Sequence, residues 1–410
     1  VSNNLKSTSG SLLILLMVGA LSGSWLISGI IPSMIFYGIK ILNPTVFLAA
    51  SVVISALISV ATGSSWTTSA TVGIALIGIG NAMGVPVGMT AGAIISGAYF
   101  GDKMSPLSDT TNLAPVMAGG ELFSHIRYMT YTTIPSIAIT LIVFIVLSLG
   151  LEVNGTVETA SLNAAIEERF FISPILFIVP VLVVLMIVKK TPPLIALLAG
   201  TLLGGVVALI FQPSLVASIT GANSLNLENG YKGMLTAFTT DVSISTSNEA
   251  LNDLFNSGGM AGMLGTIWLI VCAMVFGGVM EAIGALNRIT QSLLSLAQST
   301  FGLFASTVAS CLAINLTASD QYLAIVVPGK MFSKAYKDRG LAPENLSRTL
   351  EDSGTVTSAL IPWNTCGAYH SSVLGVPVFE YFIFAVFNYV SPFVTLIFAA
   401  LNIKIKQLRA

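Results

Sequence analysis

The chain has 410 residues, of which 54% are hydrophobic and only 9% are charged, and its formal net charge is −1. A soluble domain carries about 25% charged residues, so this composition excludes an ordinary soluble protein and indicates a polytopic protein of the lipid bilayer. The near-zero net charge gives no reason to expect a nucleic acid partner. Cys272, Cys311 and Cys366 have no paired or metal-ligand spacing. With no nucleotide loop, metal–His cluster or hydrolytic triad in the sequence, we expect neither a cofactor nor an enzyme.

Apolar stretches that can cross a membrane, which takes about 20 helical residues, recur along the whole chain. They lie at residues 11–38, 87–100, 126–149, 172–188, 193–211, 259–286, 346–361 and 381–403. Together they predict an all-α polytopic fold. The connection 151–171 reads as a polar loop, and residues 212–258, rich in Asn, Ser, Thr and Gly, read as extramembranous.

Two further apolar stretches, residues 44–80 and 301–337, are each divided by a polar tip. The first tip contains Gly63, Ser64, Ser65 and Thr67, and the second contains Ser319 and Asp320. Polar, non-helical backbone at membrane depth is tolerated only where protein buries it or water lines it. We therefore predict two re-entrant hairpins whose tips lie inside the protein.

Two other segments, residues 87–120 and 345–375, are interrupted by a proline and are predicted to be broken helices. The first break carries the polar residues Asp102, Ser105, Ser108, Asp109, Thr110, Thr111 and Asn112, and the second carries Asn364 and Thr365. A charge at the centre of a bilayer costs about 2.5–3.5 kcal/mol even on the most lenient scale. So many polar groups at this depth indicate an ion or substrate path.

The hairpins and breaks repeat in one register. Trp66 and Tyr322, Gly73 and Gly329, and Pro106 and Pro362 are all 256 residues apart. We predict two repeats, at residues 1–150 and 151–410, and further helices before Val1 would complete the first. An odd number of crossings between them makes the repeats inverted, the architecture of secondary transporters. Basic residues gather on one predicted side, which makes that side and the C-terminus cytoplasmic.

Asp109 is the strongest candidate for an ion-binding residue. A carboxylate among the hydroxyls of Ser108 and Thr110 offers the hard oxygen ligands that Na⁺ prefers, and a desolvated acid can hold either a proton or a cation. Asp109 could equally cap the helix that follows, and both roles can coexist. Asp102 could pair with the adjacent Lys103, and Asp320 could cap a half-helix.

The helix that enters the second break carries another charged group. Arg348 is spaced to pair with Glu351 or Asp352 on one helix face. Asp352 is predicted to lie near the centre of the second repeat and to take part in ion binding.

Four segments resemble the NhaC-type sodium/proton antiporter family: residues 61–67 (ATGSSWT), 101–115 (GDKMSPLSDTTNLAP), 319–329 (SDQYLAIVVPG) and 345–367 (NLSRTLEDSGTVTSALIPWNTCG). The resemblance implies alternating-access exchange of Na⁺ for H⁺ across a prokaryotic cytoplasmic membrane. It also implies inverted repeats and a homodimer. Some members of such families exchange small carboxylates, coupling malate to lactate, and this stays an alternative. A buried arginine at the site would favour the alternative, and Arg348 is the candidate.

Overall fold

The structure, a computed structural model, describes residues 2–41, 43–151, 159–189, 191–247, 252 and 255–408. Two predictions concern the ends of the chain: helices before Val1, and a cytoplasmic C-terminus at Ala410. Both of these residues lie outside the described part. Within the described chain, only β1 (Val242–Ser243) and β2 (Asn256–Ser257) form a sheet, and the other regular elements are helices. The predicted all-α class is confirmed at this level.

Several described helices are long and apolar enough to cross a membrane. They are α3 (Pro44–Thr62), α8 (Leu122–Leu149), α11 (Pro193–Phe211), α18 (Thr300–Thr317) and the pair α15 (Gly259–Gly262) and α16 (Leu264–Ala282). Further spans are bent: α1 (Ser2–Ile27) meets α2 (Ile30–Ile41) at 70°, and η2 (Pro174–Phe177) with α10 (Ile178–Val188) meets α9 (Thr159–Arg169) at 79°. Near the C-terminus, α22 (Val378–Tyr381) and η5 (Phe382–Phe384) meet α23 (Val386–Ala400) at 50°. These helices support a polytopic membrane protein.

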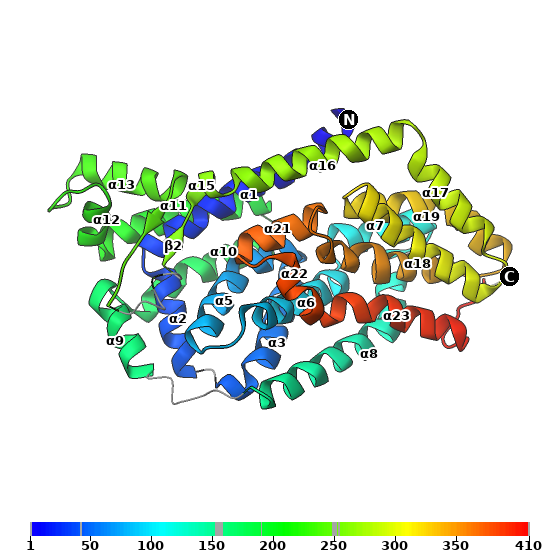
Figure 1. Cartoon of the computed structure of the whole chain (residues 1–410), viewed down its shortest axis with the longest axis horizontal. Helices are drawn as coiled ribbons and strands as arrows, with labels where there is room; N and C mark the ends of the chain where they lie inside the picture. The colour runs from blue at the N-terminus through cyan, green and yellow to red at the C-terminus, as the bar shows by residue number, and fades with distance from the viewer. Residues whose placement is uncertain are drawn as a thin grey trace.

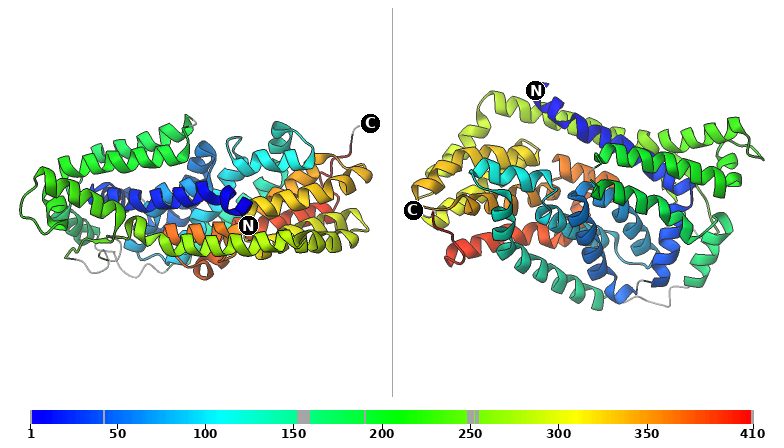
Figure 2. Two further views of the ribbon diagram at one scale, coloured as in Figure 1. Left: turned by 90° about the horizontal axis from the view of Figure 1, so that it is seen from above. Right: turned by 180° about the vertical axis from the view of Figure 1, so that it is seen from behind.

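The prediction of a polar loop at 151–171 is wrong for residues 159–169, which form α9. Its sequence, TASLNAAIEER, is rich in the good helix formers Ala and Glu, so polarity did not prevent a helix. The predicted extramembranous segment contains α12 (Pro213–Ile219), α13 (Leu227–Thr239) and the small sheet. In Figure 1, α9, α12 and α13 lie at one end of an elongated molecule, and α17 (Ala285–Ser295) lies at the other with the C-terminus. Figure 2 shows the same elongated outline from above and behind.

Each predicted hairpin is a helix, a short break and a second helix. In the first, α3 ends at Gly63, whose φ of 70° is left-handed, and Ser64 caps α4 (Ser65–Thr68), which continues through the π-turn η1 (Ser69–Gly73) into α5 (Ile74–Ala82). In the second, α18 ends before Ser319, whose φ is 61°, and Asp320 caps α19 (Gln321–Asp338). The left-handed residue and the cap therefore recur 256 residues apart.

The two predicted broken helices are interrupted at equivalent places. Helix α6 (Val87–Met104) stops before Pro106, and Ser108 caps α7 (Asp109–Ala118). The second begins as α20 (Pro343–Leu350), continues as the π-turn η3 (Glu351–Thr355) and the 3-10 helix η4 (Val356–Leu360), and resumes as α21 (Thr365–Leu374) after the cap Asn364. Both α7 and α21 end on a left-handed glycine, Gly119 and Gly375. All these boundaries keep the spacing of 256 residues.

Close packing joins the first hairpin to the first broken helix. A side chain at Gly97 would place its Cβ 2.2 Å from the Val52 carbonyl oxygen, so α6 approaches α3 there to backbone distance. Ser59 Oγ donates to the Ala98 carbonyl at 2.6 Å across the same contact. Small residues allow such contacts between membrane helices, which have no hydrophobic drive to associate within lipid.

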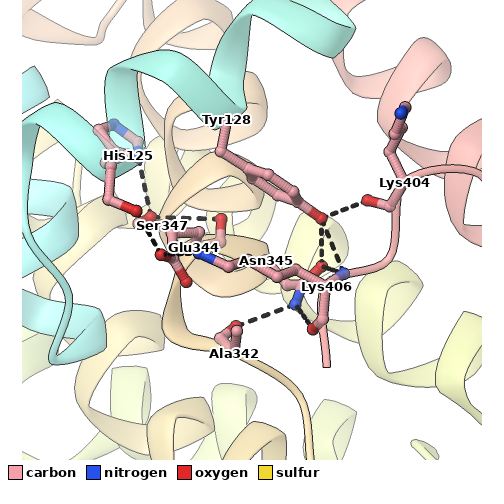
Figure 3. Close-up of polar contacts among 9 residues, drawn as sticks. His125, Tyr128, Ala342, Glu344, Asn345, Ser347, Lys404 and Lys406 are labelled. Atoms are coloured by element: carbon pink, nitrogen blue, oxygen red, sulfur yellow. Dashed lines mark hydrogen bonds and ion pairs between the residues drawn. The ribbon is translucent and has the colours of Figure 1, made fainter. Parts of the chain in front are cut away.

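A polar network ties the C-terminal segment to the bundle (Figure 3). The Tyr128 hydroxyl donates to Asn345 Oδ1 at 2.6 Å, and Asn345 Nδ2 donates to the Lys406 carbonyl at 2.7 Å. Lys406 Nζ forms an ion pair with Glu344 at 2.5 Å, and His125 Nδ1 lies 2.8 Å from Ser347 Oγ. These contacts hold the segment after α23 against α8 and α20.

Candidate functional site

A cavity of about 870 Å³ lies where the interrupted helices meet. It is lined at the first hairpin break by Thr62, Gly63, Ser64, Trp66 and Thr67, and at the α6–α7 break by Asp102, Pro106, Leu107, Ser108, Asp109 and Thr110. The second hairpin contributes Asp320, Gln321, Tyr322, Leu323 and Val326, and the second broken helix contributes Thr365. Among the described lining residues there are three carboxylates and no Lys, Arg or His. The charged side chains among these described lining residues are therefore all acidic.

Asp102, in the last turn of α6, is only 6% exposed and is held by the first hairpin. Its Oδ2 accepts from the Ser65 backbone N–H at 3.2 Å and from Ser65 Oγ at 2.7 Å. Because Ser65 begins α4, these donors lie at the positive end of a helix, where a carboxylate is favoured. Asp102 thus links the broken helix to the hairpin tip as well as lining the cavity.

Asp109 is the first residue of α7 and differs from Asp102 in its surroundings. Ser108, not Asp109, caps the helix by accepting from the Thr111 N–H at 3.4 Å. The Asp109 side chain is exposed and makes no hydrogen bond or ion pair with any described residue. We expected a desolvated acid here, and the structure instead has a carboxylate that is open to the cavity and free to take a ligand.

Asp320 has the capping role that the sequence left open. Its Oδ1 accepts from the Leu323 N–H at 2.9 Å at the start of α19. The Thr365 N–H donates to the carbonyl oxygen of Ser319, the residue before Asp320, at 3.0 Å, and this bond joins the second hairpin tip to α21. Asn364 is fully buried and donates to Asn315 Oδ1 at 3.0 Å. Of this group, Asp320 and Thr365 reach the cavity, whereas Ser319 and Asn364 support it.

Other predicted residues hold the α6–α7 break together without lining the cavity. Ser105 Oγ donates to the Val60 carbonyl at 2.8 Å, and Thr111 Oγ1 donates to the Lys103 carbonyl at 3.0 Å. Asn112 Nδ2 donates to the Ser108 carbonyl at 2.7 Å. The first two bonds satisfy carbonyl oxygens in the last turns of α3 and α6, which a helix end leaves free. Ser65 is also absent from the lining, because its hydroxyl is engaged by Asp102.

Asp352 does not reach the cavity, contrary to expectation. It is fully buried, forms an ion pair with Lys103 and accepts from Thr132 Oγ1 at 2.8 Å and from Thr395 Oγ1. The alternative pairing of Lys103 with Asp102 is therefore wrong, as is that of Arg348 with Asp352. Both predictions considered only residues adjacent in sequence or on one helix face, whereas the partner of Lys103 lies 249 positions away in the chain.

The sequence reading missed part of the cavity wall. Gln321 and Tyr322 follow Asp320 directly, so their position at the tip was a usable signal. The remaining wall comes from α1, through Gly10 and Ile14, and from the turn between α10 and α11 at Thr191, Pro192 and Pro193. These residues are apolar or lie at an ordinary turn, and no local pattern distinguishes them.

A bundle of apolar spanning helices around an acidic cavity at helix breaks defines a polytopic membrane transporter, not an enzyme. The family model described as Na⁺/H⁺ antiporter family matches residues 97–403, and the chain belongs to this family. Proteins called Na⁺/H⁺ antiporter NhaC are each 38% identical to it. The Alkalihalophilus pseudofirmus protein aligns over 95% of this chain and 81% of its own length, and the Bacillus subtilis protein over 97% and 85%.

A relative with a different name is almost as similar. The malate-2H⁺/Na⁺-lactate antiporter of Bacillus subtilis is 35% identical over 99% of this chain and 81% of its own length. Membership of the family therefore does not by itself separate a cation exchanger from an organic-anion exchanger.

Proposed function

We propose that this chain is a secondary antiporter that exchanges Na⁺ for H⁺ across the cytoplasmic membrane of a prokaryotic cell. The observation that carries the proposal is the cavity lined by Asp102, Asp109 and Asp320 without a basic side chain among its described lining residues. Asp102 and Asp320 are only 6% and 8% exposed, so they attract cations more strongly than carboxylates in water do. The same wall repels anions unless a cation accompanies them.

Asp109 is the residue at which the two cations compete. Asp102 and Asp320 already accept hydrogen bonds at helix N-termini, whereas Asp109 has none from the described chain. The hydroxyls of Ser108 and Thr110 lie 3.2 Å apart beside it and complete an oxygen set suited to Na⁺. Because a carboxylate that binds Na⁺ cannot hold a proton at the same oxygens, one ion leaves when the other binds.

Alternating access supplies the movement. The shared spacing of the four caps and of the left-handed residues Gly63 and Ser319 supports two structurally related repeats, residues 1–150 and 151–410, and we propose that they are inverted and carry re-entrant hairpins. Transporters of this kind move one bundle against another around a site at the repeat interface. The cavity reaches the α10–α11 turn beside Lys189, on the predicted cytoplasmic side, so we assign the structure to an inward-open arrangement.

The test uses purified protein in vesicles that contain a pH-sensitive dye and an imposed pH gradient. Addition of Na⁺ should dissipate the gradient, and Asp109→Asn should abolish this response while the protein remains folded. Asp241→Asn, the same change at an exposed aspartate that does not line the cavity, is the matched control and should transport normally. Na⁺-driven dissipation by Asp109→Asn at the control rate would remove Asp109 from the mechanism.

A coupled organic-anion exchanger is the second candidate, and the size of the cavity favours it. About 870 Å³ is in the range of sites that hold small organic molecules and exceeds the needs of a bare cation. Arg348 does not provide the expected carboxylate partner, because it is fully buried and absent from the cavity lining. In the same vesicles, an absolute requirement for malate or lactate would establish this candidate and overturn simple Na⁺/H⁺ exchange.

A further inference from the structure

Two oppositely charged residues one helical turn apart are buried without partners. Glu351 is 0% exposed, and neither of its carboxylate oxygens has a hydrogen bond within the described chain. Arg348 is also 0% exposed, and its Nε and Nη2 atoms have no partner among the described residues. The guanidinium instead lies over the Tyr128 ring, 4.6 Å from its centroid, and makes one long bond of 3.4 Å to the Lys404 carbonyl.

The protonation states follow from burial. An ionised carboxylate that is removed from water and given no donor costs several kcal/mol, so such a group keeps its proton instead. Glu351 is therefore neutral in this arrangement. Arginine cannot become neutral in this way, because its guanidinium stays protonated at every accessible pH. The pair consists of a carboxylic acid and an unneutralised cation.

No other described cation is available to Glu351. Lys103, on α6, is committed to Asp352, which also holds the hydroxyls of Thr132 and Thr395. Asp102, near the end of the same helix, and Asp352 are the acidic groups that act on Glu351 electrostatically. His125, on α8, is held by Ser347, and Tyr336 on α19 and Cys311 on α18 are uncharged. Among the residues that the structure describes, Arg348 is the buried cation without an acidic partner.

The backbone between Arg348 and Glu351 can change how close the two side chains lie. Residues at i and i+3 on a helix are neighbours, with about 5–6 Å between their Cβ atoms. Arg348 lies in α20, and Glu351 begins the π-turn η3. A π-turn holds one extra residue, and its migration or loss rotates the residues on one side of it; such turns are frequent at functional sites. A small rearrangement can therefore bring the carboxylate to the guanidinium.

We propose that Glu351 is a second proton-carrying residue, distinct from the cavity carboxylates, which releases its proton when it pairs with Arg348. In the present arrangement Glu351 holds the proton. In the alternative arrangement the O–H bond breaks, the proton passes to water that the rearranged bundle admits, and the carboxylate forms an ion pair with Arg348. This inference rests on the proposed antiport and adds one proton to each transport cycle.

The protonation state can be tested without transport. Infrared difference spectra of the purified protein at neutral pH should contain the carbonyl stretch of a protonated carboxylic acid that is absent from Glu351→Gln. Glutamine has the shape of the protonated acid, so this variant should fold. Identical carboxylic acid bands in the two proteins would overturn the proposal.

Vesicle transport tests the carrier role. The wild-type protein, which must show Na⁺-driven proton flux if the proposed function holds, is the reference. Glu351→Gln should carry one proton fewer per Na⁺, and Arg348→Gln should shift the pH profile of transport upward by about 1–3 pH units, because the ionised acid loses its cation. Glu344→Gln, at an acid paired with Lys406, is the matched control and should change neither. The carrier role is refuted if the wild-type protein is active, Glu351→Gln keeps the wild-type number of protons per Na⁺, and Arg348→Gln keeps the wild-type pH profile. That result leaves the proposed antiport standing.

Discussion

The ion pair between Lys103 and Asp352 allows the sharpest test of the energetics of this fold. Both side chains are 0% exposed, and the pair joins α6 of the first repeat to η3 of the second. Removing one partner of a buried pair costs about 3–5 kcal/mol, because the other charge is left uncompensated. Lys103→Met leaves Asp352 with two hydroxyl donors, Thr132 and Thr395. Asp352→Asn leaves the Lys103 ammonium buried without a counter-charge and with only a neutral amide oxygen to accept from it, so it should be the more damaging change.

The double variant separates the stabilisation that the ion pair provides from the destabilisation that a single unpaired charge causes. Lys103→Met with Asp352→Asn removes both charges, so its free energy of unfolding should be closer to wild type than that of Asp352→Asn alone. Equilibrium unfolding in mixed detergent micelles, followed by tryptophan fluorescence, measures each variant. The control is Lys232→Met, which removes an i,i+4 pair whose side chains are 60% and 71% exposed; solvent screens such a pair, so its loss should change stability little. Single variants at the buried pair that cost no more than this control would refute the reasoning.

Three further changes have defined outcomes. Gly63→Ala should destabilise the detergent-solubilised protein by about 1 kcal/mol or more, because φ at Gly63 is 70° and the new Cβ would lie 2.6 Å from the Leu107 Cβ. A thermal melt like that of the wild type would show that the hairpin tip adapts. Ser108→Ala should cost about 1 kcal/mol through loss of the α7 cap, measured in the same melt, and a neutral effect would contradict that role. Although burial alone would raise the pKa of Glu344, hydrogen bonds from Lys406 and Ser124 lower it from 4.5. The stability gap between wild type and Glu344→Gln should therefore be full above pH 4.5 and close as the pH falls below it, and a gap that persists in acid would argue against the pair.

Much of the helix framework was predictable because breaks have local signals. Pro106 and Pro362 interrupt their helices, and Ser64 and Asp320 are good cap residues placed directly before apolar runs. A spacing that recurs three times also predicts where equivalent helices begin. The helix α9 was missed because the prediction looked for apolar runs of membrane-spanning length, whereas α9 buries only a short set, Leu162, Ala165 and Ile166.

The cavity was predictable only in part, because burial and pairing depend on the other repeat. Asp109 and Asp102 were both expected to be site residues, yet their exposures differ in a way that no local pattern encodes. Lys103 pairs with a residue 249 positions away rather than with its neighbour in sequence. His125 is fully buried against Ser347, a contact between residues 222 positions apart that no local pattern indicates.

The common spacing of the helix breaks also determines how negative charge is shared between the halves. Each acid named here as a predicted site residue has a hydroxyl amino acid 256 positions away: Asp102 with Ser358, Asp109 with Thr365, Asp320 with Ser64, and Asp352 with Ser96. An acid at both members of each pair would place twice as many anions around the helix breaks, and like charges repel strongly where water is scarce. At these four pairs of positions the two break-bearing segments therefore match in backbone spacing and complement each other in side-chain chemistry.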